Sequence, residues 1–350
     1  MTPPATAQRR ALISRLFPDG PPTLWCPPLT HYTATGRLDR PRIAAHLRSF
    51  APYAKGVLVP GSTGDGWEMD DPMARELLNL VLGLAPDLGI VVLVGALKPN
   101  PDAVCRTIAD TATWLRRRAS TNNNAEAMAA ARVVGYAFCP PTGATLPQST
   151  IRNGLASALE LGLPSALYQL PQVTQNEVAP ETVAALAARF GNLYMMKDSS
   201  GADRVAVSGL DLGGLFLVRG AECDYRRWFH AAGGPYRGFL LSTANCFAPL
   251  LHGMLDAQAH DRTADAHAAS ELVSRAISGV FDLVADLPHG NMYTNANKAI
   301  DHFMAHGPNA AALDTPMLHA GMRLPMAVVD ATGALLTQLG LMPAKGYLDA

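Results

Sequence analysis

Charged side chains are scarce in this sequence. Asp, Glu, Lys and Arg make up 16% of the residues, and the formal net charge at pH 7 is −1. A charge this small and balanced provides no basic field that would attract nucleic acid or an anionic membrane surface. We therefore expect neither a nucleic acid nor a membrane as a partner.

Long apolar runs and paired cysteines are missing as well. No apolar stretch approaches the ~18 residues that a membrane-spanning helix needs. The five cysteines include no C-x-x-C pair, which argues against a zinc site and a disulfide framework. Unpaired cysteines suit a reducing compartment, so we expect a cytoplasmic protein. Residues 1–20 carry arginines without the apolar segment of a secretion signal, and we interpret them as an N-terminal arm.

Lysine is rare too, so few amines are available as nucleophiles. Lys197 stands apart, because it follows the apolar run 194–196 and precedes the polar run 198–200. This pattern is typical of a buried strand that opens into a loop, where parallel α/β folds bind ligands. Apolar surroundings lower the pKa of a lysine from ~10.4, and the neutral amine can then attack a carbonyl. The alternative is a lysine that reaches solvent or pairs with Asp198.

The other four lysines have poorer positions. Lys98 also follows an apolar run, but Gly95 already ends that run and Pro99 follows at once, so we expect Lys98 in a loop. Lys55 precedes a strand, and Lys298 lies in a helical stretch. The remaining lysine, at position 345, is close to the C-terminus.

Strand-like and helix-like segments alternate between residues 21 and 245. The expected strands are 23–26, 56–59, 90–94, 133–138, 165–168, 194–197, 214–218 and 238–241. Helical stretches separate them, and about eight such alternations imply an all-parallel sheet covered on both faces. A closed (β/α)8 TIM barrel fits this length better than an open sheet.

The chain divides into three parts on this interpretation. We expect an N-terminal arm over 1–20, the barrel over 21–245 and a C-terminal helical region over 246–350. Helices are expected over 222–231, 247–287 and 295–305. Residues 120–130, with three consecutive asparagines, interrupt the alternation and are interpreted as a surface insertion.

A polar turn follows the second expected strand. Residues 61–65 read G-S-T-G-D, and hydroxyls, backbone N–H groups and glycines of this kind suit a carboxylate or a phosphate. A carboxylate is favoured because no Walker lysine and no G-x-G-x-x-G motif accompany the turn. The same residues are also ordinary turn chemistry.

Two further candidates have a structural alternative. Tyr168 ends the fifth expected strand, where its hydroxyl could relay protons or simply belong to the core. His302 and His306 are four residues apart beside Asp301, a spacing that could hold a metal on one helix face. No third ligand is evident, so we expect a solvated helix face and no metal. No G-x-S-x-G nucleophile motif is present.

Four motifs together resemble those of a known family. Residues 61–65 correspond to its G-T-T-G-E, 168–171 (Y-Q-L-P) to Y-N-x-P, 196–201 (M-K-D-S-S-G) to I-K-D-S-S-G, and 238–245 to its eighth-strand G-x-x-S-x-x-A-N. With these motifs in the same order, the chain resembles the dihydrodipicolinate synthase / N-acetylneuraminate lyase family of class I aldolases from about residue 21 to residue 245.

The resemblance implies a covalent mechanism without a cofactor. Lys197 would form a Schiff base with the ketone of pyruvate or another 2-keto acid, and the iminium would act as an electron sink. Tyr168 would move protons to and from the substrate oxygen. The family also implies a homo-oligomer, a dimer or a tetramer.

The resemblance implies substrate-binding residues too. Ser62 and Thr63, with backbone N–H groups beside Gly61, would hold the carboxylate of the keto acid. Leu240, on the eighth strand, would pack near the Schiff base.

Two departures from the family motifs argue against the synthase activity of the family. Val173 stands where the synthase has an arginine for a second carboxylate, and an isopropyl group cannot bind a carboxylate. Residues 139–142 lack the tyrosine that the family lends to a neighbouring subunit. We predict a lyase for a 2-keto acid such as a 2-keto-3-deoxy sugar acid, with pyruvate as one partner. The alternatives are a sugar-acid dehydratase using the same imine and a non-catalytic paralogue that binds a keto acid.

Overall fold

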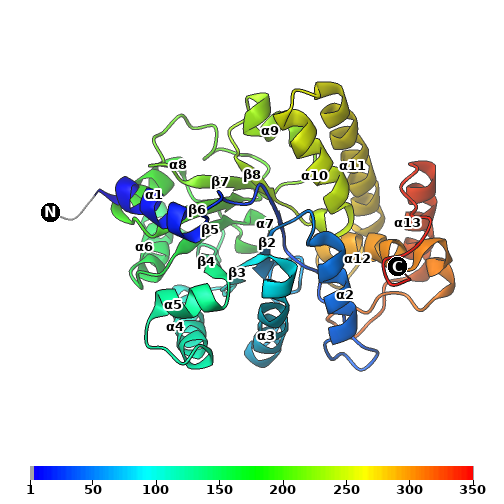
Figure 1. Ribbon diagram of the computed structural model, residues 1–350, viewed down its shortest axis with the longest axis horizontal. Coiled ribbons are helices and arrows are strands. Elements are labelled where there is room, and N and C mark those ends of the chain that lie inside the picture. The colour runs from blue at the N-terminus through cyan, green and yellow to red at the C-terminus, as the bar shows by residue number, and fades with distance from the viewer. Residues whose placement is uncertain (1–3, 350) are drawn as a thin grey trace.

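Eight parallel strands form a closed barrel in this computed structural model, which describes residues 4–349 (Figure 1). Each strand pairs with its neighbour along the chain, and the last strand pairs with the first. The strands are β1 (Leu24–Cys26), β2 (Gly56–Val59), β3 (Val91–Gly95), β4 (Val133–Phe138), β5 (Ser165–Gln169), β6 (Leu193–Asp198), β7 (Phe216–Arg219) and β8 (Gly238–Leu240). The predicted TIM barrel is confirmed.

Helices cover the outside of the barrel, as the alternating pattern predicts. The helices that follow the strands in the sequence are α2 (Arg40–Phe50), α3 (Asp71–Leu88), α4 (Pro101–Arg118), α5 (Asn124–Ala130), α6 (Gln148–Leu159), α8 (Pro180–Arg189) and α9 (Tyr225–Trp228), and the single turn α7 (Pro171–Thr174) directly follows β5. Local signals set their ends: Asp70 caps the first turn of α3 through the Met73 N–H, and Gly89 ends that helix at a φ of 63°.

The structure adds detail to two expectations for this part of the chain. The segment 120–130, expected as a surface insertion, contains the helix α5, which Asn123 caps. The stretch 222–231 is helical only in part: it contains α9 and the start of the short 3₁₀ helix His230–Ala232. Caps and tight turns determine where the helices in these two segments begin and end. Such features leave little trace in the hydrophobic pattern, so the pattern did not reveal them.

The barrel has an inner and an outer apolar core. The outer core fills the space between strands and helices, whereas the inner core lies within the ring of strands. Buried side chains of the inner core include Trp25, Leu58, Leu93, Met195 and Leu240. They fill the interior of the barrel below its C-terminal end, which is where TIM-barrel active sites lie.

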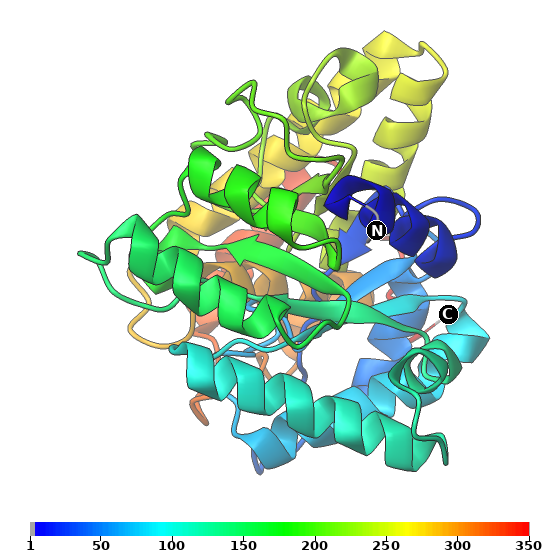
Figure 2. The same ribbon diagram turned by 90° about the vertical axis from the view of Figure 1, so that its left-hand side faces the viewer.

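The expected N-terminal arm contains an ordered helix, α1 (Ala5–Leu16), which contacts β6 and α8, and residues 1–3 of the arm lie outside the described residues. Figure 2 shows it in dark blue lying over the barrel. Leu12 and Phe17 join the inner core, where the Phe17 ring packs edge-on against Trp25 at 6.1 Å. The Arg9 guanidinium is buried and donates to the backbone carbonyls of four residues, namely Ala187, Phe190, Leu193 and Gly213.

The C-terminal residues form a group of helices at one side of the barrel (Figure 1). They are α10 (Ala244–Ala259), α11 (Thr263–Val284), α12 (Met292–His306) and α13 (Met326–Gln338). The stretch 247–287 is therefore helical as expected, and it consists of two helices with a break near His260. Within residues 4–349, no helix combines the length and the apolar character needed to cross a membrane.

Candidate active site

Lys197 lies near the end of β6, at the C-terminal end of the barrel. Its side chain is 5% exposed and lines a small cavity of about 10 Å³. The nine residues around this cavity are Ser62, Thr63, Tyr168, Leu170, Lys197, Ser199, Gly220, Ser242 and Tyr293. The alternative of a lysine reaching bulk solvent is wrong.

Burial changes the protonation of the Lys197 amine. Removal from water lowers the pKa of Lys197 to about 7, against weaker opposing effects of the Cys139 thiol and the Glu222 carboxylate. At neutral pH a large fraction of the amine is therefore neutral and nucleophilic. In the part of the chain that the structure describes, no carboxylate forms an ion pair with it, so Asp198 does not neutralise it.

Tyr168 stands beside Lys197 on the neighbouring strand. The two residues are register partners in β5 and β6, and the Lys197 Nζ lies 3.9 Å from the centroid of the Tyr168 ring. Burial raises the pKa of Tyr168 well above its usual value of 10. The phenol therefore keeps its proton at neutral pH and can donate it to an oxygen in the cavity.

The turn after β2 contributes Ser62 and Thr63 to the same cavity. Backbone hydrogen bonds from Gly64 and Gly66 to the Gly61 carbonyl fold the turn, at 3.1 and 2.9 Å. Hydroxyls held in this way beside the amine suit the carboxylate of a keto acid.

Gly61 and Leu240 do not line the cavity. Gly61 packs against Pro27, which lies 2.7 Å from where a Cβ on Gly61 would be, so this glycine allows the loops to approach closely. Leu240 is fully buried in the inner core, opposite Trp25 of β1. Both residues pack behind the residues that line the cavity, and their roles toward a substrate stay predictions.

Glu222 lies close to the cavity and was not predicted. Its carboxylate accepts hydrogen bonds of 2.6 Å from both Ser242 and Thr243 and one of 2.8 Å from Tyr225. Its position three residues after the end of β7 is the one signal in the sequence that could have indicated it.

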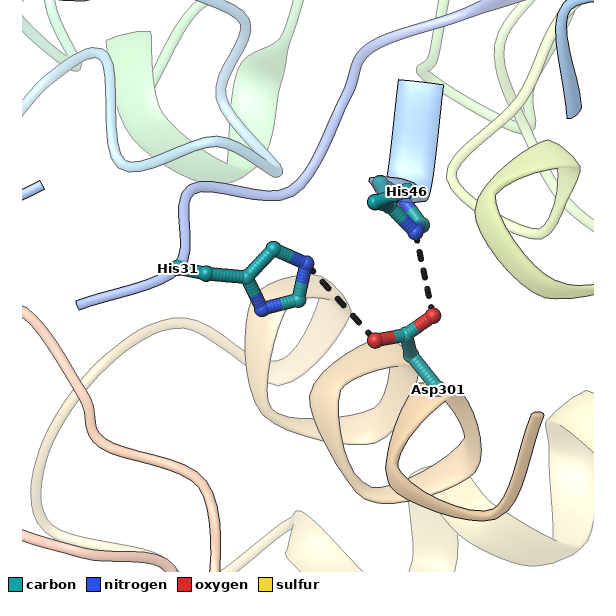
Figure 3. A group of neighbouring side chains, drawn as sticks. All are labelled: His31, His46 and Asp301. Atoms are coloured by element: carbon teal, nitrogen blue, oxygen red, sulfur yellow. Dashed lines mark ion pairs between the residues drawn. The ribbon is translucent and has the colours of Figure 1, made fainter. Parts of the chain in front are cut away.

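Three buried residues elsewhere resemble a metal site at first sight. Figure 3 shows His31 and His46 pointing toward the carboxylate of Asp301, and their potential ligand atoms lie within 4.8 Å of one another. However, the Arg42 guanidinium donates to the Asp301 Oδ2 at 2.6 Å, and the Tyr347 hydroxyl donates to Oδ1 at 3.0 Å. A guanidinium on the same carboxylate oxygen opposes a metal cation.

The charges in this cluster neutralise one another instead. Burial acts to raise the pKa of Asp301, but Arg42 and His46 outweigh it and hold the pKa well below its usual value. Burial also lowers the pKa of His31 well below 6.5, with Arg42 acting in the same direction. The cluster therefore joins α2, α12 and the C-terminal tail as a structural ion-pair network.

The remaining sequence candidates lie away from the cavity. Lys98 pairs with Asp71 at 2.6 Å in the loop where it was expected. His302 is buried and its ring contacts the Ala310 carbonyl at 2.8 Å, so the expected solvated helix face is wrong for this residue. Apolar packing against α13 and the short 3₁₀ helix after α12 explains the difference, since α12 is covered on several sides.

Comparison with known proteins gives one related sequence and many related folds. No family model matches the chain. The 4-hydroxy-tetrahydrodipicolinate synthase of Agrobacterium fabrum is 26% identical over 219 residues, which cover 62% of this chain and 68% of that protein. The name of this relative, a dipicolinate-type synthase, agrees with the family that the four motifs resemble.

Two solved structures illustrate the shared fold. A prophage protein of the dihydrodipicolinic acid synthase family from E. coli, in complex with pyruvate, is 19% identical with a TM-score of 0.69. The match covers 91% of this chain and 99% of that one. A variant of the 2-keto-3-deoxygluconate aldolase of Sulfolobus solfataricus is 14% identical with a TM-score of 0.68, over 92% and 99% of the two chains. At these identities the matches support the fold.

Proposed function

Because the chain belongs to the dihydrodipicolinate synthase / N-acetylneuraminate lyase family of class I aldolases, we propose that it is a Schiff-base lyase for a 2-keto acid. The observation that carries the proposal is the buried Lys197, whose pKa falls to about 7 at the C-terminal end of the barrel. A neutral amine beside hydroxyl groups is what imine formation with a keto acid requires.

The first step joins the enzyme to the keto acid. The Lys197 Nζ attacks the C2 carbonyl carbon, and the carbonyl oxygen takes up protons and leaves as water, which gives an iminium. Tyr168 supplies a proton to that oxygen, because its phenol stays protonated beside the amine. Ser62 and Thr63 hold the carboxylate.

The second step breaks the carbon–carbon bond. The electron pair of the C3–C4 bond moves into the iminium to give an enamine, while the C4 hydroxyl loses its proton and becomes an aldehyde. Protonation of the enamine at C3 and hydrolysis of the imine then release pyruvate. The same steps in reverse condense pyruvate with an aldehyde. All of these steps use groups of the chain and water alone.

We propose a 2-keto-3-deoxy sugar acid as the substrate. Val173, partly buried beside the inner core in α7, offers no cation for the second carboxylate that a dicarboxylate substrate would bring. A polyhydroxylated aldehyde would instead meet the hydroxyls of Ser199 and Ser242 on the cavity wall. We further propose that the protein acts in the cytoplasm as a homo-oligomer, a dimer or a tetramer, which sedimentation of the purified protein would test.

Product analysis tests the proposed reaction. Purified protein is incubated with a series of 2-keto-3-deoxy sugar acids, and pyruvate release and water loss are both measured. We expect pyruvate release by the parent protein and none above background by Lys197→Met. Loss of water without pyruvate would instead identify a dehydratase using the same imine. No turnover of any kind, with retained keto-acid binding, would identify a non-catalytic paralogue.

A further inference from the structure

The C-terminal region contacts the active site through the first turn of α12. The Asn291 side-chain amide donates to the Ser62 carbonyl at 3.2 Å, and the Thr294 hydroxyl donates to the Thr63 carbonyl at 2.9 Å. Asn291 also caps the helix by accepting from the Thr294 N–H at 2.9 Å. Residues 291–294 are therefore fixed against the turn that carries two of the proposed substrate-binding hydroxyls.

A buried ion pair reinforces this attachment one turn further along α12. The Lys298 Nζ lies 3.4 Å from the Asp65 carboxylate, and both side chains are buried. Asp65 belongs to the same turn as Ser62 and Thr63. Because this amine is paired and lies outside the cavity, it is no rival to Lys197; it positions α12.

Tyr293 lies between these anchors and forms part of the cavity wall. Eight of the nine lining residues are buried, and Tyr293 alone is half-buried, so it lies on the side of the cavity toward solvent. Its ring packs edge-on against Phe281 of α11 at 5.3 Å. Within residues 4–349 its hydroxyl makes no hydrogen bond to another protein group, which leaves it available to a ligand.

The proposed lyase reaction needs proton transfer at two separate oxygens. One is the keto oxygen, which leaves as water beside Lys197 and Tyr168. The other is the aldehyde oxygen, which lies further from the imine along the substrate. A cavity of about 10 Å³ has room for about one water, so the aldehyde portion must extend toward the solvent side, where Tyr293 lies.

We propose that Tyr293 is a second catalytic residue of this site, which exchanges a proton with the aldehyde oxygen. The inference rests on the proposed lyase function. In condensation the enamine carbon attacks the aldehyde carbon, the carbonyl electron pair moves to oxygen, and that oxygen takes the proton of Tyr293. The proton released from C3 when the enamine forms passes to water, and after the carbon–carbon bond has formed water returns a proton to the Tyr293 phenolate, so protons balance. Cleavage uses the same transfers in reverse.

The surroundings of Tyr293 suit this role. Burial raises the pKa of Tyr293, and the Glu222 carboxylate acts in the same direction. The phenol therefore begins each condensation cycle protonated.

Replacement of Tyr293 by phenylalanine distinguishes an effect on carbon–carbon bond cleavage from an effect on imine formation. Tyr293→Phe keeps the ring and its packing on Phe281 while removing the hydroxyl. We expect kcat for pyruvate release to fall about 100-fold, as is typical of a lost general acid–base group. Borohydride trapping of pyruvate on Lys197 should proceed at the parent rate, because imine formation does not involve the aldehyde oxygen. Tyr53→Phe, at an exposed tyrosine of the barrel's outer surface, is the matched control and should keep the parent kcat.

Three results would overturn the inference, and they differ in what they say of the proposed function. Normal kcat together with normal trapping in Tyr293→Phe would refute the catalytic role and leave the lyase proposal intact. Equal losses of kcat and trapping would show a structural role for the residue. Absence of any pyruvate adduct in the parent protein would refute the lyase proposal and this inference with it.

Discussion

Lys197 and Gly220 fit together because residue 220 has no side chain. A Cβ at position 220 would lie 2.6 Å from the Lys197 Cε and 2.1 Å from the Ser199 Oγ, both far inside normal contact distance. Gly220 directly follows β7, and its N–H donates to the Asp198 carbonyl at 2.6 Å, so its backbone is fixed close to β6. The space occupied by the lysine therefore depends on this glycine.

A methyl group at position 220 should displace the amine. We expect Gly220→Ala to lower kcat/KM about 100-fold, since a shift of about 1 Å in a reacting group has effects of that size. Gly83→Ala is the matched control, because no atom lies within 4 Å of its added Cβ on the surface of α3. Steady-state kinetics of both variants provide the measurement, and parent-like activity in Gly220→Ala would contradict the account.

The lowered pKa of Lys197 predicts a pH dependence of imine formation. Below about 7 the amine is mostly protonated, so the rate of pyruvate trapping should rise about tenfold per pH unit; above about 7 it should level off. Single-turnover trapping between pH 5 and 10 would measure this profile. A rate that keeps rising toward pH 10 would indicate an ordinary solvated lysine.

Arg9 should contribute strongly to stability although it lies far from the active site. Its guanidinium donates to carbonyls of four residues, and a lysine can satisfy only some of them. We expect Arg9→Lys to lower the free energy of unfolding by about 3 kcal/mol, because buried carbonyls lose charged donors. Urea denaturation should show this, with the exposed Arg10→Lys unchanged as the control. Equal stabilities of the two variants would contradict the role of Arg9.

The Asp301 cluster predicts a loss of stability in acid. The pKa of folded Asp301 lies below its unfolded value, so its stabilising effect is complete above the unfolded pKa of about 4 and is lost as the pH falls further. Asp301→Asn should lower the free energy of unfolding by about 3 kcal/mol at pH 7, since Arg42 loses its buried partner. It should also weaken the dependence of stability on pH below about 4.

Unfolding experiments with a chelator test whether the Asp301 cluster binds a metal. Because a guanidinium occupies the carboxylate, EDTA should leave the unfolding midpoint of the parent protein unchanged. A lower midpoint after chelation would show that His31, His46 and Asp301 hold a metal.

The barrel and the position of Lys197 were predictable because both depend on local sequence. Short apolar runs that end in glycine or polar residues indicate buried parallel strands, and Lys197 ends one of them. The cavity partners Ser62, Thr63 and Tyr168 were found for the same reason, since each follows or ends a strand.

Groups brought together over long sequence distances were not predictable. Tyr293 lies in the first turn of a C-terminal helix, where its sequence neighbours give no sign that it faces the barrel. His31, His46 and Asp301 meet only because the fold brings α12 close to α2 and the loop before it. The break between α10 and α11 was also missed, because apolar residues occur at helical spacing on both sides of His260.

The central claim is that the Lys197 amine bonds covalently to a 2-keto acid. The most direct measurement is borohydride reduction of the protein in the presence of pyruvate, followed by mass spectrometry of a tryptic digest. We predict one reduced pyruvate adduct on the peptide 190–204, with cleavage after Lys197 blocked, and no adduct in Lys197→Met. An adduct on another lysine such as Lys98, or no adduct at all, would contradict the account.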